Sequence, residues 1–199
     1  MQAGYALWMH RALLACLLLA GLQSCAAIQS RERDASVTLH YGQVVMIDDD
    51  EWQGADDQTV GAVSFEWPLG TGDWSTEIGA AYFDKQTSPG FNAKFETQTT
   101  EVSVGARRSF GTFWTTIHPY VGLGGAVLYT EQEFQPALGA PRTDEDWNGG
   151  VYFSAGFWGA LDEGVRIGTE FRVLVEEPFD PGGLEMDYTR LTFTLGYGF

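Results

Sequence analysis

Acidic side chains crowd three segments of this 199-residue sequence, and carboxylate oxygens are the ligands that Ca²⁺ and Mg²⁺ prefer. The first segment contains the candidate metal ligands Asp48, Asp50, Asp56 and Asp57. These residues lack the remaining positions of an EF-hand loop. Acidic surface segments are usually only solvated and mutually repelling. The sequence therefore predicts no bound metal, and divalent-ion binding in this segment stays the functional alternative.

Histidine and serine are the other residues that could perform chemistry. Beyond residue 24 there are two histidines, His40 and His118, and neither lies in an HExxH pattern or beside a cysteine at metal-ligand spacing. Neither Ser109 nor Ser154 lies in a Gly-x-Ser-x-Gly elbow. Residues 122–125 (GLGG) lack the third glycine and the following helix of a dinucleotide site. We predict no catalytic residue and no cofactor.

The charge of the chain indicates which kinds of partner it can bind. The chain has 11 Lys and Arg against 27 Asp and Glu, a formal net charge of -16. Binding to nucleic acid needs clustered basic residues, so this function is excluded. Seven Trp, eight Tyr and 13 Phe argue against a disordered acidic chain.

The N-terminus has the features of an export signal over residues 1–24. His10 and Arg11 precede an apolar stretch, residues 12–22, that is too short to span a bilayer. The following Leu22-Gln-Ser-Cys25 resembles the lipobox of bacterial lipoproteins, which implies a lipid on Cys25. Ordinary cleavage after Ala26 is the alternative. We expect residues 25–35 to form a linker, and residues 36–199 to form one domain.

This domain shows strict two-residue alternation of apolar and polar side chains, which is typical of β-strands. In the last segment Leu191, Phe193 and Leu195 alternate with Thr192 and Thr194. Seven similar segments precede it, and an even number of strands is typical of a closed membrane barrel. Connections over residues 47–58, 85–94, 130–149 and 176–186 are long, whereas those over residues 68–73, 108–115 and 162–164 are short.

The volume of the side chains decides which face points inward. The lumen of an eight-stranded barrel is only just wide enough to be filled by side chains. Phe153, Phe171 and Phe193 would overfill it, so the small polar face belongs inside. The sequence thus predicts an all-β, eight-stranded antiparallel up-and-down transmembrane β-barrel. A soluble lipocalin-like ligand-binding barrel, with the faces reversed, is the alternative.

Two sets of residues fit this orientation. The inward face carries four acids and four bases, which predicts a neutral polar network because unpaired buried charges are costly: Glu66, Glu77, Glu101, Glu170, Arg107, Arg166, Arg172 and Arg190. Aromatic residues are expected to form interfacial girdles: Trp67, Trp74, Phe113, Trp114, Tyr197 and Phe199 near the short turns, and Tyr82, Tyr129, Trp147 and Tyr188 near the long connections.

The terminal strand, residues 191–199 (LTFTLGYGF), ends on an aromatic residue. It resembles the assembly signal of the small eight-stranded OmpA-like and OmpX-like outer-membrane barrels of Gram-negative bacteria, and residues 118–125 (HPYVGLGG) are similar to one of their central strands. The resemblance implies a bacterial outer-membrane location, periplasmic termini and long surface loops. It also implies that Tyr197 and Phe199 are recognised by the barrel-assembly machinery.

From this resemblance we expect a non-enzymatic protein with a structural or surface-interaction role through four long acidic extracellular loops. Its expected partners are outer-membrane lipid and lipopolysaccharide, and the sequence does not identify a surface ligand. The alternatives are a lipid A deacylase-like enzyme and a small-solute channel. The deacylase pattern places His and Ser late in the chain, but residues 170–177 (EFRVLVEE) contain neither. A lumen full of charged side chains leaves little room for a solute.

Overall fold

The computed structural model describes residues 35–47, 57–70, 72–90, 93–112, 116–136, 140–161, 164–178 and 187–199. The expected signal segment, Cys25, most of the linker, and Asp48, Asp50 and Asp56 lie outside these residues. The described residues form eight strands: β1 (Ser36–Met46), β2 (Asp57–Pro68), β3 (Trp74–Gly90), β4 (Ala93–Ser109), β5 (Ile117–Gln135), β6 (Arg142–Ala160), β7 (Val165–Pro178) and β8 (Tyr188–Gly198). None of the described residues belongs to a helix long and apolar enough to cross a membrane.

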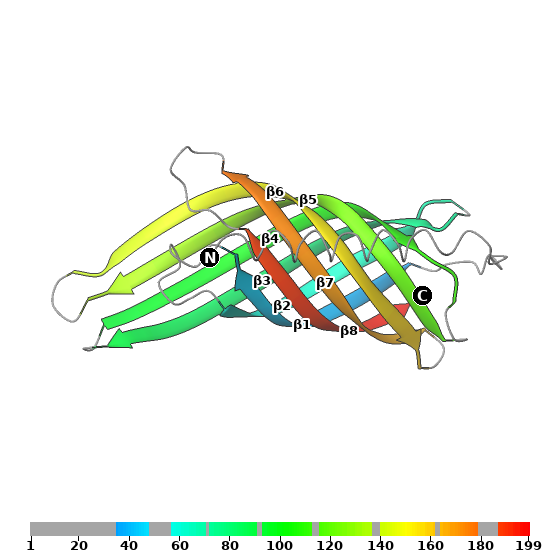
Figure 1. Ribbon diagram of the computed structural model, residues 1–199, viewed down its shortest axis with the longest axis horizontal. Helices are drawn as coiled ribbons and strands as arrows, with labels where there is room; N and C mark the ends of the chain where they lie inside the picture. The colour runs from blue at the N-terminus through cyan, green and yellow to red at the C-terminus, as the bar shows by residue number, and fades with distance from the viewer. Residues whose placement is uncertain are drawn as a thin grey trace, which may run out of the picture. The chain divides into compact units, whose positions relative to one another are not determined.

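The eight strands close into one barrel (Figure 1). Each strand pairs antiparallel with the next, and β8 pairs antiparallel with β1 from Ser36↔Gly198 to Met46↔Tyr188. The backbone N–H of Phe199 then donates to the carbonyl oxygen of Ala35 at 2.9 Å, which extends the seam by one bond. The predicted eight-stranded antiparallel up-and-down barrel is confirmed.

The bulky apolar side chains point outward, as predicted. Phe193 is 73% exposed and Leu39 is 56% exposed, whereas their inward neighbours Thr192 and His40 are buried. The same alternation recurs on every strand because successive side chains of a strand point to opposite faces. A soluble ligand-binding barrel would have the opposite arrangement, so that alternative is wrong.

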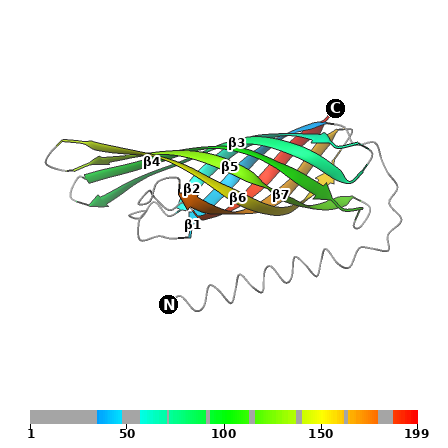
Figure 2. The ribbon, with the colours of Figure 1, turned by 90° about the horizontal axis from the view of Figure 1, so that it is seen from above.

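Two of the connections expected to be long loops are largely strand. β3 and β4 stay paired as far as Gly90↔Ala93, and β5 and β6 as far as Phe134↔Arg142. We call residues 84–90, 93–98, 131–135 and 142–147 the projecting sheet. Figures 1 and 2 show it extending beyond the barrel at the end opposite the C-terminus. Two-residue alternation alone does not show where a strand leaves the barrel, since the period is the same on both sides of the rim.

The lumen also contains an apolar layer that the sequence analysis did not identify. It lies toward the projecting sheet and forms the only extended hydrophobic core cluster of the described residues: Val44, Met46, Val60, Ala81, Phe83, Ala126, Leu128, Tyr152, Leu174 and Tyr188. Tyr188 was assigned to an outer girdle, and this assignment is wrong. Its ring is fully buried and meets the ring of Phe83 edge-on, with 5.5 Å between centroids.

Candidate functional site

The centre of the lumen holds a cluster of acidic and basic side chains, which we call the charge cluster. Arg172 on β7 reaches three carboxylates: Glu101 at 2.9 Å, Glu77 at 3.0 Å and Glu170 at 3.3 Å. Glu77 and Glu101 lie on β3 and β4, on the opposite wall of the barrel. One guanidinium therefore ties together strands that share no backbone ladder.

Arg107 on β4 forms the second connection. Its guanidinium contacts Glu66 at 3.2 Å and Glu170 at 2.8 Å, and it is also paired with Glu77. The hydroxyl of Ser75 donates to Glu66, so this carboxylate is held from two sides. The planar guanidinium suits such a role because it offers five donors in a fixed geometry.

Arg190 on β8 completes the charge cluster. Its guanidinium lies 3.1 Å from Glu170 and 3.8 Å from Glu101. The hydroxyl of Tyr120 donates to Glu170 at 3.2 Å, and that of Tyr188 donates to Glu101. Hydrogen bonds of this kind satisfy lone pairs that would otherwise be costly to bury.

The ion pairs described above join seven of the eight residues expected in the polar network. Arg166 lies nearer the short-turn end, with its guanidinium carbon 4.5 Å from the ring centroid of Trp158. These ion pairs connect four carboxylates and three guanidiniums. The parity of a position shows which face it occupies, but its height along the barrel axis depends on strand register.

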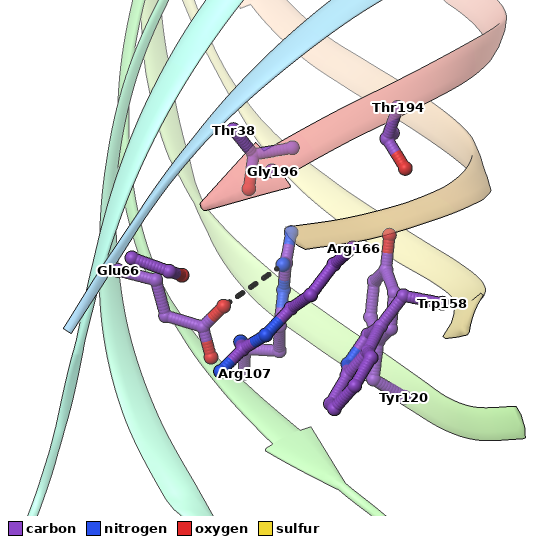
Figure 3. Close-up of a pocket in the computed structure, with 9 residues that line it drawn as sticks. Thr38, Glu66, Arg107, Tyr120, Trp158, Arg166, Thr194 and Gly196 are labelled. Carbon is purple, nitrogen blue, oxygen red and sulfur yellow. Dashed lines mark hydrogen bonds and ion pairs between the residues drawn. The ribbon is translucent and has the colours of Figure 1, made fainter. Parts of the chain in front are cut away.

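Arg166 and Trp158 line a small cavity together with Glu66, Arg107 and Tyr120 (Figure 3). Its volume is about 20 Å³, and a second cavity beside His40 measures about 10 Å³. A buried water needs roughly 10 to 15 Å³. These two cavities in the described part of the lumen therefore fit water molecules, and the charge cluster and the apolar layer lie beside them.

The structure places a serine beside a histidine inside the lumen. The ring nitrogen Nε2 of His40 lies 3.0 Å from the hydroxyl of Ser64, and both residues are buried. Among the described residues, Nδ1 of His40 has no hydrogen-bond partner, so no acidic group orients the ring as in a catalytic triad. The ring of His118 stacks on the ring of Trp158, with 3.9 Å between the ring centroids.

The candidate metal ligands are not assembled in the part of the chain that the structure describes. No group of three or more His, Cys, Asp or Glu suited to a metal occurs there. Asp57, the one candidate ligand with described coordinates, forms an ion pair with Lys85. Its carboxylate is thus engaged by a cation of the neighbouring strand.

The outward face of the projecting sheet is acidic. Glu131, Glu133 and Glu145 were expected in the long connection over residues 130–149, but they lie on β5 and β6. Glu96 is directly opposite Glu133, and Glu131 is directly opposite Glu145. Like charges at directly opposite positions are destabilising. Lys94 offsets part of this repulsion through a 2.7 Å contact with Glu96. Hydrogen bonds from Lys94 and Gln98 lower the pKa of Glu96 and keep this carboxylate ionised.

Exposed aromatic residues lie at both ends of the apolar outer surface. Near the short turns, the exposed aromatic residues are Trp74, Tyr197 and Phe199. Near the projecting sheet, the ring of Trp147 packs against that of Tyr129, with 4.9 Å between the ring centroids. Tyr197 and Phe199, the residues of the expected assembly signal, both point outward. Phe113 and Trp114 lie outside the described residues.

Comparison with known proteins identifies the fold. No family model and no curated protein matches the sequence. Among solved structures, the chain is similar to Ail, the attachment invasion locus protein of Yersinia pestis, solved with the heparin analogue sucrose octasulfate (13% identity, 85% of this chain and 100% of Ail, TM-score 0.58).

Two further structures are similar. Neisserial surface protein A has 12% identity over 83% of this chain and 96% of its own, with a TM-score of 0.51. The N-terminal β-barrel domain of Pseudomonas aeruginosa OprF has 17% identity over 84% of this chain and 100% of its own, with a TM-score of 0.50. This chain therefore has the fold of the small eight-stranded outer-membrane β-barrels.

Proposed function

We propose that this chain is a non-enzymatic integral protein of the bacterial outer membrane with a structural or surface-interaction role. The observation that carries the proposal is the combination of an apolar outer surface with a filled lumen and a polar sheet that projects from one end. The apolar surface suits hydrocarbon. The filled lumen leaves the projecting sheet and the connections beside it as the parts available to a partner.

Membrane embedding is tested by fractionation and gel mobility. A folded barrel that resists detergent is expected in the outer-membrane fraction and migrates differently before and after boiling, because its closed ladder has no free edge at which unfolding can begin. Recovery of the full chain as a soluble protein with one mobility would contradict the proposal.

The charge of the projecting sheet indicates the kind of partner. Four outward carboxylates in two opposed pairs repel one another, and a basic partner would relieve this repulsion. A sulfated polyanion such as the ligand in the Ail structure would increase it. We therefore propose that the projecting sheet contacts a basic protein surface rather than a polyanion.

A fluorescent lysine-rich peptide tests this choice on cells that display the protein. Removing four carboxylates from the projecting sheet is expected to weaken peptide binding about fivefold at low salt, because electrostatic attraction scales with the local charge. The test variant combines Glu96→Gln, Glu131→Gln, Glu133→Gln and Glu145→Gln. The control, with the same change in net charge, combines Asp48→Asn, Asp49→Asn, Asp50→Asn and Glu51→Gln. Equal binding by the two variants would contradict a role for the projecting sheet.

We also propose that the terminal aromatic residue guides assembly. Replacement Phe199→Asp is expected to lower the amount of folded barrel in the membrane strongly, because it removes the aromatic residue that follows β8 at the seam. Heat-modifiable protein in membrane fractions is the measurement. Phe65→Asp is the control, since Phe65 is also exposed and its ring centroid lies 6.2 Å from that of Phe199. Normal levels of the Phe199→Asp variant, or equal losses in both, would argue against a terminal signal.

A further inference from the structure

Arg108 is a basic residue on the lipid-facing side of the barrel. Arg107 points into the lumen and is buried, so the next residue of β4 points outward, and Arg108 is exposed. It pairs with Trp74 on β3 and with Val121 on β5. The outward residues that precede it on β4, Val102 and Val104, are apolar and exposed. The charge therefore borders a hydrocarbon-facing surface.

Two aromatic rings flank the guanidinium of Arg108. Its central carbon lies 5.8 Å from the ring centroid of Trp74 and 5.6 Å from that of Phe110. Both distances fall within the range of a cation–π contact, about 6 Å. Backbone hydrogen bonds from Ser109 to Asp73 at 3.0 Å and from Phe110 to Pro119 at 2.8 Å fix the strand end that carries the group.

The structure gives Arg108 no carboxylate partner within the residues that it describes, whereas Arg107 contacts three. The undescribed residues of the two flanking turns, 71 and 113–115, contain no acid. Aromatic faces attract the cation but supply no hydrogen-bond acceptor of the kind that a guanidinium prefers. Its N–H donors are therefore available to an anion from outside the chain.

The depth of Arg108 identifies the source of that anion. Thr100, which pairs with Tyr82 and Tyr129 at the opposite aromatic girdle, lies eight residues earlier on β4. At about 3.3 Å per residue and a tilt near 40°, this separation is roughly 20 Å along the membrane normal, close to the height of the apolar band. Arg108 therefore lies at the hydrocarbon edge, where phospholipid phosphates are found.

We infer that Arg108, Trp74 and Phe110 form a binding site for the headgroup phosphate of a glycerophospholipid in the leaflet around the short-turn end of the barrel. The inference rests on the membrane embedding proposed above. The guanidinium binds the phosphate oxygens in a bidentate manner, while the two rings occupy the headgroup region. Phosphatidylglycerol is preferred over phosphatidylcholine, because the choline ammonium competes with Arg108 for the phosphate.

Native mass spectrometry of the full chain tests this site. The folded protein is released from micelles that contain equal amounts of phosphatidylglycerol and phosphatidylcholine. Wild type is expected to retain phosphatidylglycerol in preference, and Arg108→Gln to lower this preference about fivefold, the factor expected for one basic residue at a membrane surface. Arg108→Lys is expected to retain part of it. Arg142→Gln removes an exposed arginine of the projecting sheet and should leave the preference unchanged.

The outcomes separate this inference from the proposed function. If Arg108→Gln is embedded and heat-modifiable but retains lipid with the wild-type preference, the phosphate site is wrong and the membrane barrel stands. If Arg142→Gln loses the preference equally, the effect is one of total charge and the site is again wrong. If wild type itself is not embedded, both conclusions fall.

Discussion

Replacement of Arg172 by Met is expected to lower the free energy of unfolding by about 3 to 5 kcal/mol, the range observed when one partner of a buried ion pair is removed. Arg172 is 2% exposed and contacts Glu77, Glu101 and Glu170 at 2.9 to 3.3 Å. Without its guanidinium, three buried carboxylates and the partly buried Glu66 face two basic groups. The loss of stability is measured as a lower midpoint of urea unfolding in detergent. Unfolding is followed by the gel mobility of unheated samples.

Two further variants show whether charge is the cause. Arg142→Met removes an arginine that is 77% exposed and paired with the exposed Asp144, and such surface pairs contribute about 0 to 1 kcal/mol. Its midpoint should stay near that of wild type. Adding Glu101→Gln to Arg172→Met restores the excess of carboxylates to one, and part of the stability should return. A wild-type midpoint for Arg172→Met would disprove the structural role of the charge cluster.

Replacement of Gly42 by Ala is expected to prevent closure of the barrel or to destabilise it by about 3 kcal/mol or more, above the usual range for overpacking. A Cβ atom on Gly42 would lie 2.0 Å from the carbonyl oxygen of Leu191 and 2.8 Å from the Cα of Thr192. Both are backbone atoms of β8, so no side chain can move to relieve the clash. The seam between β1 and β8, which closes the ladder, would have to separate.

Gly61→Ala is the matched control for this prediction. Gly61 lies on β2 opposite Tyr41, and a Cβ atom there would meet nothing within 4 Å. Alanine costs less conformational entropy than glycine in a strand, so this variant should be as stable as wild type or slightly more stable. The fraction of heat-modifiable protein after refolding compares the two. Normal refolding of Gly42→Ala would show that the seam tolerates a side chain at this position.

The residues of the lumen show how far sequence reasoning extends toward the site. Alternation correctly assigned Glu101 and Arg172 to the inward face, but these residues are 71 positions apart in the chain. Their contact depends on the register of each intervening strand pair and on the closure of β8 against β1. Arg166 has the same parity as Arg172 but lies at another height, where its guanidinium carbon is 4.5 Å from the ring centroid of Trp158.

The apolar layer shows that the sequence pattern also fails to identify inward apolar residues. Val44, Phe83 and Leu128 occupy inward positions, but in the sequence the outward residues beside them carry the stronger apolar pattern. They form a core only because three distant strands bring them to one height. Tyr188 was assigned outward for its aromatic character, although its parity matches that of the inward Arg190.

By itself, the sequence determined the number of strands, their antiparallel order and the face that meets lipid. These features follow from a period of two residues and from the small volume of an eight-stranded lumen, both of which are local or geometric constraints. Only the tertiary structure decided which inward charges meet, where the apolar layer lies and how far β3 to β6 extend beyond the rim. Those features depend on strand register, and register is fixed by the closure of the whole barrel rather than by any one segment.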